Sequence, residues 1–307
     1  LNHQILAINR GESEGILSGN IVADEDAITR YLKFRLVGGK KGPATDILVQ
    51  AAQAAYKRFI GPAIAREIQK TLFGRASRDA IKVFGTNLYH LLMAAPLRGQ
   101  IVLGFDPGIR TGSKLAVVDK AGQFLDKAVI YPHKAQKYDP KGARETIIKL
   151  VKKYQVTLVA IGNGTASRES QQFVADIIQN ELPDLRYVVV NEAGASVYSA
   201  SDVARAEFPD LPVEQRSAIS IARRLQDPMA ELIKIDPQAV GVGQYQHDLP
   251  TKELSLELDN VLETAVNQVG VNLNTASPQL LTHIAGLTTT IAKNIVDYRE
   301  KNGRFTN

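Results

Sequence analysis

IVLGFDPGIRTGSKLAVVD, residues 101–119, is the stretch that decides the fold of this chain. Its first five residues are an unbroken apolar run, which predicts a central strand buried on both faces. The run ends at Asp106 in a tight Asp-Pro-Gly turn, and residues 114–118 form a second predicted strand. A carboxylate at the end of a buried strand, followed by a glycine turn, suits a metal or phosphate site. Asp-Pro-Gly is also an ordinary turn in which the carboxylate accepts turn amides, so both interpretations stay open.

Strands and helices alternate after this stretch. Of the four strands predicted after Asp106, the first two form an antiparallel hairpin. Each of the next two follows a helix, and these helices begin at Asp139-Pro140 and at Ser167. This order indicates a mixed sheet of the ribonuclease-H type, because a plain doubly wound fold lacks the hairpin. The four predicted strands lie at residues 115–119, 124–131, 158–161 and 188–190.

The N-terminal part of the chain has a different pattern. Residues 4–9 and 15–22 predict two short extended runs joined by a polar hairpin loop. Asp24 is placed to cap a short helix that ends near Phe34. Residues 38–43, GGKKGP, predict a flexible connector.

Apolar stripes predict helices throughout residues 44–95, broken at Gly61-Pro62 and at Gly74 and ended by Pro96. Cations lie between the stripes, and a solvated helix face accounts for them better than a phosphate-binding patch does. We therefore interpret these helices as a scaffold. The cations are Lys57, Arg58, Arg66, Lys70, Arg75, Arg78 and Lys82.

Residues 237–307 are again helical. A long helix ends at Gly270, Ser277 then caps a short helix, and Thr288 caps the next one. The two short helices, joined by an Ala-Gly-Leu turn, form a helical hairpin.

Composition limits the classes of function. The formal net charge of +5 and the isoelectric point near 9.2 favour polyanionic partners only weakly, since many proteins that bind nothing acidic are as basic. The sequence contains no cysteine, which excludes disulfides and thiolate metal sites and predicts a reducing, cytoplasmic location. No apolar run reaches the ~18 residues of a membrane span, so we expect no membrane partner.

Five stretches resemble the Tex family of bacterial transcription accessory proteins, which is related to a eukaryotic elongation factor. The resemblance covers essentially the whole chain and implies a multidomain α and α/β fold. In that family a second hairpin and an RNA-binding OB domain follow, and we expect both to be missing here. The stretches are HQILAINRGESEGIL (3–17), IVLGFDPGIRTGSKLAVVD (101–119), VVVNEAGASVYSASD (188–202), GVGQYQHD (241–248) and VGVNLNTASPQLLTHIAGLTTTIAKNIVDYREKNGRF (269–305).

The resemblance also implies domain limits. Residues 1–38 would be the end of the N-terminal Tex-type region, and residues 39–97 a helical scaffold. Residues 98–236 would form a YqgF-type ribonuclease-H-like domain, and residues 237–307 a truncated helix-hairpin-helix region.

Candidate catalytic residues follow from the same resemblance. Nucleases of this fold place several carboxylates at the carboxyl edge of the sheet to hold two metal ions. Asp106 matches the first-strand aspartate of that pattern, and Glu192 matches the YqgF glutamate. We expect one strand to lie between them, with their backbones roughly 10 Å apart.

The sequence departs from an active nuclease at two positions. Asn163 stands where junction-resolving relatives have an acid, and Arg216 falls where a late helix is expected to supply an aspartate. Asp202 and Asp227 are nearby substitutes, although neither has the expected offset. We therefore favour loss of catalysis, and expect no cofactor, with Mg²⁺ needed only if the domain is a nuclease.

Five residues of the hairpin are predicted to bind nucleic acid: Ala285, Gly286, Leu287, Thr288 and Lys293. Glycine permits close backbone approach, a helix N-terminus offers free amides to a phosphate, and lysine adds a full charge. A plain hairpin packed into a scaffold explains the apolar spacing equally well. The apolar residues expected between its two helices are Leu280, Leu281, Ile284, Leu287, Ile291 and Ile295.

Three functions remain as hypotheses. The favoured one is a non-catalytic factor that binds RNA or DNA independently of sequence and acts with the transcription machinery. The second is a metal-dependent nuclease that uses Asp106 and Glu192 with Asp202 or Asp227. The third is a phosphotransferase of the actin and sugar-kinase type, suggested by the loop from Asp106 to Thr111; that fold needs two such domains, and the sequence offers one.

Overall fold

The computed structural model describes residues 1–40, 42–134, 137–274, 276–303 and 305. Lys41 of the predicted connector lies outside the described residues. The chain divides into two compact units, Leu1–Val83 with Gly243–Glu253, and Phe84–Val242 with Leu254–Asn307. Within the described ranges, no helix is both long and apolar enough to cross a membrane.

The first unit begins with a helix, and the prediction of extended runs there is wrong. Residues 4–9 lie inside α1 (Asn2–Ser13), and residues 15–22 contain no strand. Short apolar runs do not distinguish a strand from a helix by periodicity. Leu6 is the buried residue of α1, and an Arg10–Glu14 ion pair one turn apart supports the helical conformation.

The helices that follow are longer than predicted. The first two are α2 (Glu25–Val37), where Asp24 caps the Ala27 amide as expected, and α3 (Pro43–Ala55). A π-helical turn, η1 (Tyr56–Ile60), then joins α3 directly to α4 (Gly61–Leu92).

The breaks predicted at Gly61-Pro62 and at Gly74 are therefore wrong. In a regular helix the ring of Pro62 would clash with the carbonyl one turn earlier, and the wider π-turn accommodates it. Gly74 is tolerated inside α4, as an isolated glycine in a helix can be. The last helix ends at Leu92, shortly before Pro96.

The second unit contains a five-stranded mixed sheet, as the sequence predicted. Its strands are β1 (Val102–Asp106), β2 (Ser113–Val118), β3 (Phe124–Ile130), β4 (Leu158–Gly162) and β5 (Arg186–Val190). Their spatial order is β3-β2-β1-β4-β5. The first three strands pair antiparallel, whereas β1, β4 and β5 run parallel. The carboxyl ends of β1, β4 and β5 therefore lie at one edge of the sheet.

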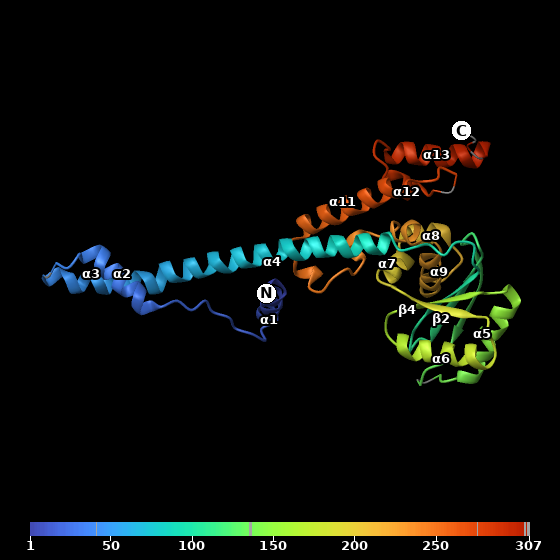
Figure 1. Ribbon diagram of the computed structural model, residues 1–307, viewed down its shortest axis with the longest axis horizontal. Helices are drawn as coiled ribbons and strands as arrows, with labels where there is room; N and C mark the ends of the chain where they lie inside the picture. Colours follow the sequence, from blue (N-terminus) through green and yellow to red (C-terminus); the bar gives the residue numbers. More distant parts are fainter. Residues whose placement is uncertain (41, 135–136, 275, 304, 306–307) are drawn as a thin grey trace. The chain divides into compact units, whose positions relative to one another are not determined.

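Helices cover both faces of the sheet (Figure 1). On one face lie α5 (Pro140–Tyr154), capped by Asp139 as predicted, and α6 (Ser167–Asn180). On the other face lies α9 (Val213–Gln226), which approaches β1 so closely that a Cβ at Gly104 would overlap the Ala218 carbonyl. This close packing fixes which residues of α9 reach the sheet edge.

Short helices surround α9. They are α7 (Ala195–Ala200), α8 (Asp202–Glu207), α10 (Pro228–Leu232) and the 3₁₀ turn η2 (Pro237–Ala239). Glu207, the last residue of α8, links α7 and α9, because it accepts from the Tyr198 hydroxyl at 2.7 Å and pairs with Arg223 at 2.7 Å; it also pairs with Lys234 at 2.9 Å. A second 3₁₀ turn, η3 (Gln246–Asp248), belongs to the first unit.

The C-terminal helices are α11 (Thr251–Val269), α12 (Pro278–Thr282) and α13 (Thr289–Asn302). Ser277 and Thr288 cap α12 and α13 as the sequence predicted. Ile291 is 41 % exposed, so its predicted place between the two hairpin helices is wrong; Ala292, the next residue, is fully buried there. The buried core of the hairpin is Ala276, Leu281, Ala292 and Val296.

Candidate nucleic-acid interface and sheet-edge acids

Asp106 ends β1 at the carboxyl edge of the sheet and is largely buried. The hydroxyl of Ser217, on α9, donates a hydrogen bond to its Oδ2. The expected acceptance of turn amides is not what the structure shows, since the Gly108 amide donates to Ser113 Oγ at 3.2 Å. Burial raises the pKa of Asp106 despite the Ser217 hydrogen bond and the nearby Lys114 charge. Among the residues that the structure describes, no cation forms an ion pair with Asp106, although Lys114 is near it.

Glu192 follows β5 and lies across β4 from Asp106, in the strand order predicted. Its backbone amide donates to Asn163 Oδ1 at 3.0 Å. The backbone amide of Asn163 in turn donates to the Val190 carbonyl, also at 3.0 Å. Asn163 therefore joins the ends of β4 and β5. Its side-chain oxygen serves this backbone link.

The Glu192 side chain occupies space that only glycines leave free. A Cβ at Gly162 or Gly164 would overlap its carboxylate oxygens. Burial and the charge of Asp106 raise the pKa of Glu192, against the Gly164 amide and Arg224. The two acids therefore lie close enough to interact. Glu192 Oε2 is buried without a hydrogen-bond partner among the described residues.

Asp202 and Asp227 do not join this pair. Asp202 opens α8, where its side chain is 93 % exposed and pairs with Arg205 at 2.9 Å. Asp227 caps α10 through the Ala230 amide and pairs with Arg98 at 3.3 Å. Across the part of the chain that the structure describes, no three His, Cys, Asp or Glu side chains gather where they could hold a metal ion.

The residue of α9 that contacts Asp106 is Ser217, whereas the sequence placed Arg216 at that position. Arg216 is buried and its Nη1 donates to the Ser199 carbonyl of α7 at 3.2 Å. The apolar face of α9 could have predicted from the sequence that Ser217 lies at the sheet. Ile221 faces the sheet, and counting back one helical turn from it reaches Ser217.

The hairpin loop is positioned by a residue that the sequence did not single out. Asn267, near the end of α11, accepts from the Ala285 amide at 3.1 Å and donates to the His283 carbonyl at 3.0 Å. Gly286 has φ +86°, a conformation that favours glycine, and a Cβ there would meet open space. The loop thus presents its backbone to solvent in a fixed conformation.

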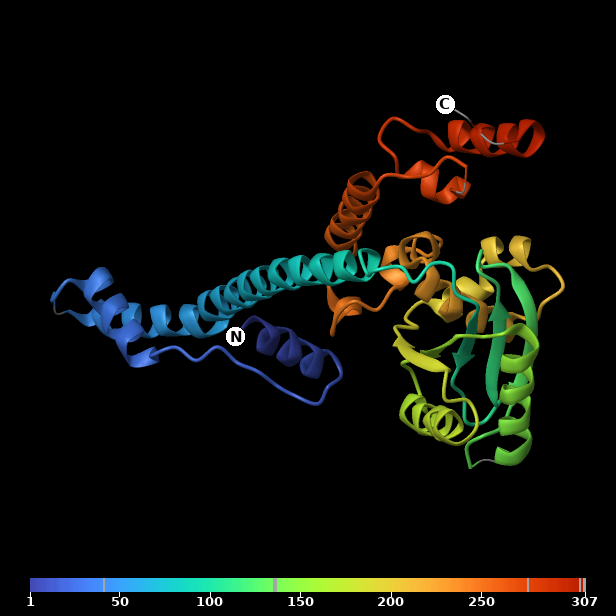
Figure 2. The same cartoon turned by 45° about the vertical axis from the view of Figure 1, so that its right-hand side comes forward.

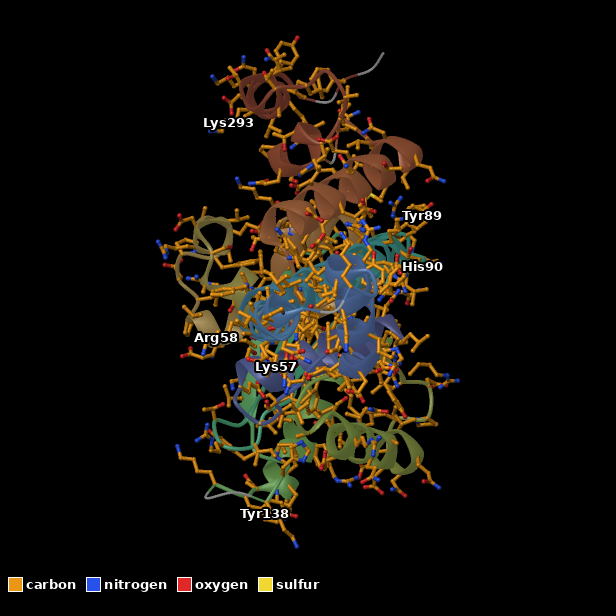
Figure 3. The ribbon with its side chains drawn as sticks, turned by 90° about the vertical axis from the view of Figure 1, so that its left-hand side faces the viewer. Lys57, Arg58, Tyr89, His90, Tyr138 and Lys293 are labelled. Carbon is orange, nitrogen blue, oxygen red and sulfur yellow. The ribbon has the colours of Figure 1, made fainter. Side chains whose placement is uncertain are left out.

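The first turn of α13 follows this loop directly. Thr288 Oγ1 accepts from the Ile291 amide, so the amides of Thr289 and Thr290 are the terminal donors of the helix. Lys293 is exposed one turn further on and extends from the outside of α13 (Figure 3). The predicted residues from Ala285 to Thr288 are thus exposed or half-exposed, and Lys293 is exposed on the helix that follows them.

Comparison with known proteins finds family matches for both the sheet domain and the helical hairpin. Residues 100–226 match the family described as the Tex protein YqgF-like domain, and residues 266–307 match the helix-hairpin-helix motif. The chain is 53 % identical over 305 residues to the uncharacterized protein YdcI of Bacillus subtilis, covering 99 % of this chain and 42 % of that protein. It is 46 % identical over 319 residues to Protein tex of Bordetella pertussis, covering 99 % and 40 %.

A human relative also aligns over the full chain. S1 RNA-binding domain-containing protein 1 is 41 % identical over 315 residues, which cover 100 % of this chain and 31 % of that protein. The chain thus spans less than half the length of these relatives. Over its whole length the chain is a homologue of Tex-family proteins, with a Tex YqgF-like domain and a helix-hairpin-helix motif.

Proposed function

We propose that this chain is the part of a transcription accessory factor that binds the backbone of RNA or DNA without reading its sequence. Homology to proteins named for transcription and for RNA binding supports this function. The same homology is the ground for proposing the transcription machinery as a further partner. The observation that carries the proposal is the geometry of the hairpin loop.

The hairpin offers a phosphate three complementary features. The backbone at Gly286 is open to close approach, the amides of Thr289 and Thr290 are unused by the helix, and Lys293 supplies a full charge. These groups recognise the backbone of a nucleic acid and leave the base edges unread. Binding should consequently be independent of sequence and weaken with salt.

The YqgF-like domain would support binding without catalysis. A two-metal nuclease needs a set of carboxylates that bridge two cations. Among the described residues no third acid joins Asp106 and Glu192, and Asn163 is used to hold the backbone of Glu192. This donor set does not fit a two-metal site. We therefore propose no metal cofactor and no cleavage step.

One observation favours the nuclease as a second candidate. Asp106 raises the pKa of Glu192, so the two acids at this edge of the sheet interact electrostatically. A cleavage assay separates the candidates: labelled branched, duplex and single-stranded substrates are incubated with the chain and millimolar Mg²⁺ or Mn²⁺. We expect no cutting. Metal-dependent cutting that disappears in both Asp106→Asn and Glu192→Gln would establish the nuclease instead.

Binding is tested by titrating the chain against labelled single-stranded RNA, single-stranded DNA and duplex DNA of random and fixed sequence. The proposal expects measurable affinity that varies little with sequence and falls linearly on a log–log plot as salt rises. An affinity that depends strongly on sequence, or that is insensitive to salt, would contradict backbone recognition.

A further inference from the structure

A cavity of about 340 Å³ lies beside β5, and neither Asp106 nor a residue of the hairpin is among those that line it. Val188 and Val190 of β5 line it, and both belong to the core between the sheet and α9. Leu91 from the end of α4 and Leu232 from α10 complete an apolar wall. The volume is in the range of sites that bind a small ligand or a few side chains.

Arg224 brings a charge to this apolar wall. It lines the cavity, is only 4 % exposed, and uses Nη1 to donate to the carbonyls of Asn191 and Ala193 at 2.8 and 2.7 Å. Its Nε and Nη2 are buried without a hydrogen-bond partner in the described part of the chain. Burial lowers its pKa to about 10, although the charges of Glu231 and Glu192 act in the opposite direction. A carboxylate that enters the cavity would supply the partner that these donors lack.

The edge of the sheet borders the same cavity. β5 is the last strand of the sheet (Figure 2), and its partner is β4. The Arg186 amide and the Val190 carbonyl are bonded to the β4 side, at 3.3 and 3.0 Å. Because backbone groups alternate along a strand, those of Tyr187 and Val189 face away from β4, toward the edge of the sheet, where no further strand pairs with β5 among the described residues. Their side chains are 37 and 41 % exposed.

We propose that β5 and this cavity bind an extended peptide of a protein partner, which adds a strand to the sheet and places an apolar and an acidic side chain in the cavity. An exposed edge strand provides the main-chain hydrogen bonds for such addition. Side chains two residues apart point to the same face of a strand, so the two occupants are spaced by one residue. The apolar side chain packs on Leu91 and Leu232, and the carboxylate pairs with Arg224.

The probe is a labelled peptide, KTVTLTETVK, in which the leucine and the glutamate share one face of the strand. Its control, KTVTLTQTVK, differs by a single neutral replacement. We expect fluorescence anisotropy to show that the glutamate peptide binds about tenfold more tightly, because its carboxylate accepts charge-assisted hydrogen bonds from Arg224. Equal affinity for the two peptides, or no binding of the glutamate peptide, would overturn the proposal.

Two variants test the edge and the cavity separately. Val189→Pro removes the amide on the open edge and should abolish peptide binding, whereas Val189→Thr keeps that amide and should preserve it. Ala94 is exposed and lines the cavity, so Ala94→Trp fills the space without interrupting a strand. Ala94→Trp should also abolish binding, and it decides the outcome if Val189→Pro does not fold. Unchanged affinity in Ala94→Trp would overturn the proposal.

Discussion

The Ser217 hydroxyl donates its hydrogen bond to the carboxylate of Asp106, at the end of the central strand. A hydroxyl satisfies one lone pair of that carboxylate but does not neutralise its charge. Asp106 is largely buried and the effect of burial outweighs both this hydrogen bond and the nearby Lys114, so its pKa lies above the ordinary value. The ionised carboxylate of Asp106 therefore destabilises the folded chain, and a neutral replacement should stabilise it.

Asp106→Asn should raise the melting temperature at neutral pH. A carboxyl group whose pKa is raised by folding destabilises the folded state wherever it is ionised. The destabilisation by ionised Asp106 is complete above the pKa of the folded state. It is absent below the pKa of the unfolded state, about 3.9 for aspartate. The stabilisation gained by Asp106→Asn should therefore disappear as pH falls from the first pKa to the second. Thermal melts across this range measure it.

Asp126→Asn is the control of opposite sign. Burial opposes ionisation of Asp126, but hydrogen bonds from Lys153 and Tyr154 outweigh it and lower its pKa. That variant should lose stability at neutral pH, and the loss should fade on acidification. If Asp106→Asn behaved like Asp126→Asn, the cost assigned to the Asp106 charge would be refuted.

The pKa of Glu192 should fall in Asp106→Asn. Burial is the largest cause of its raised pKa, and the charge of Asp106 is the second. Neutralising Asp106 leaves burial in place, so the pKa should move toward its ordinary value without reaching it. Carbon-detected NMR titration of the glutamate carboxyl reports this directly. An unchanged Glu192 titration would mean that the two acids do not interact.

Gly164→Ala should destabilise the chain by about 1–3 kcal/mol, the usual cost of overpacking. A Cβ there would overlap the Glu192 carboxylate, so the penalty should shrink in a Glu192→Ala background. Gly74→Ala is the control, since its Cβ would meet only the far end of the Arg78 side chain, at 3.7 Å. It should be neutral or stabilising by up to about 1 kcal/mol. If the effects of Gly164→Ala and Glu192→Ala on stability were additive, the proposed overlap of the new Cβ with the Glu192 carboxylate would be contradicted.

Local chemistry accounts for the elements that the sequence predicted well. Asp139 and Thr288 begin their helices with a side-chain cap, a signal confined to four residues. The buried strands gave an equally local signal, the unbroken apolar run. At the N-terminus residues 5–8, ILAI, form only a short apolar run, which fits a strand or a helix; the structure forms a helix there, in which Leu6 is buried.

The candidate site was less predictable, because it depends on rotation about a helix axis. One residue of an α-helix corresponds to about 100°, so an error of a single position exchanged Ser217 for Arg216. Asn267 was missed for another reason: its contacts to Ala285 and His283 join parts of the chain that no local pattern links. Asp202 and Asp227 lie on either side of α9 in the sequence, but an ion pair of Asp202 and the helix cap made by Asp227 hold them elsewhere.

Nucleic-acid affinity of Lys293→Glu as a function of salt is the measurement that tests the central claim most directly. Lys301→Glu is its matched control, with the same change of charge in the last turn of the same helix. We predict that Lys293→Glu weakens binding to random-sequence RNA or DNA and reduces the salt slope by about 1, while Lys301→Glu has little effect and both melting temperatures stay close to the parent value. If Lys293→Glu keeps the parent affinity and slope, the hairpin is not the contact, and the basic residues between Lys57 and Lys82 become the next site to test.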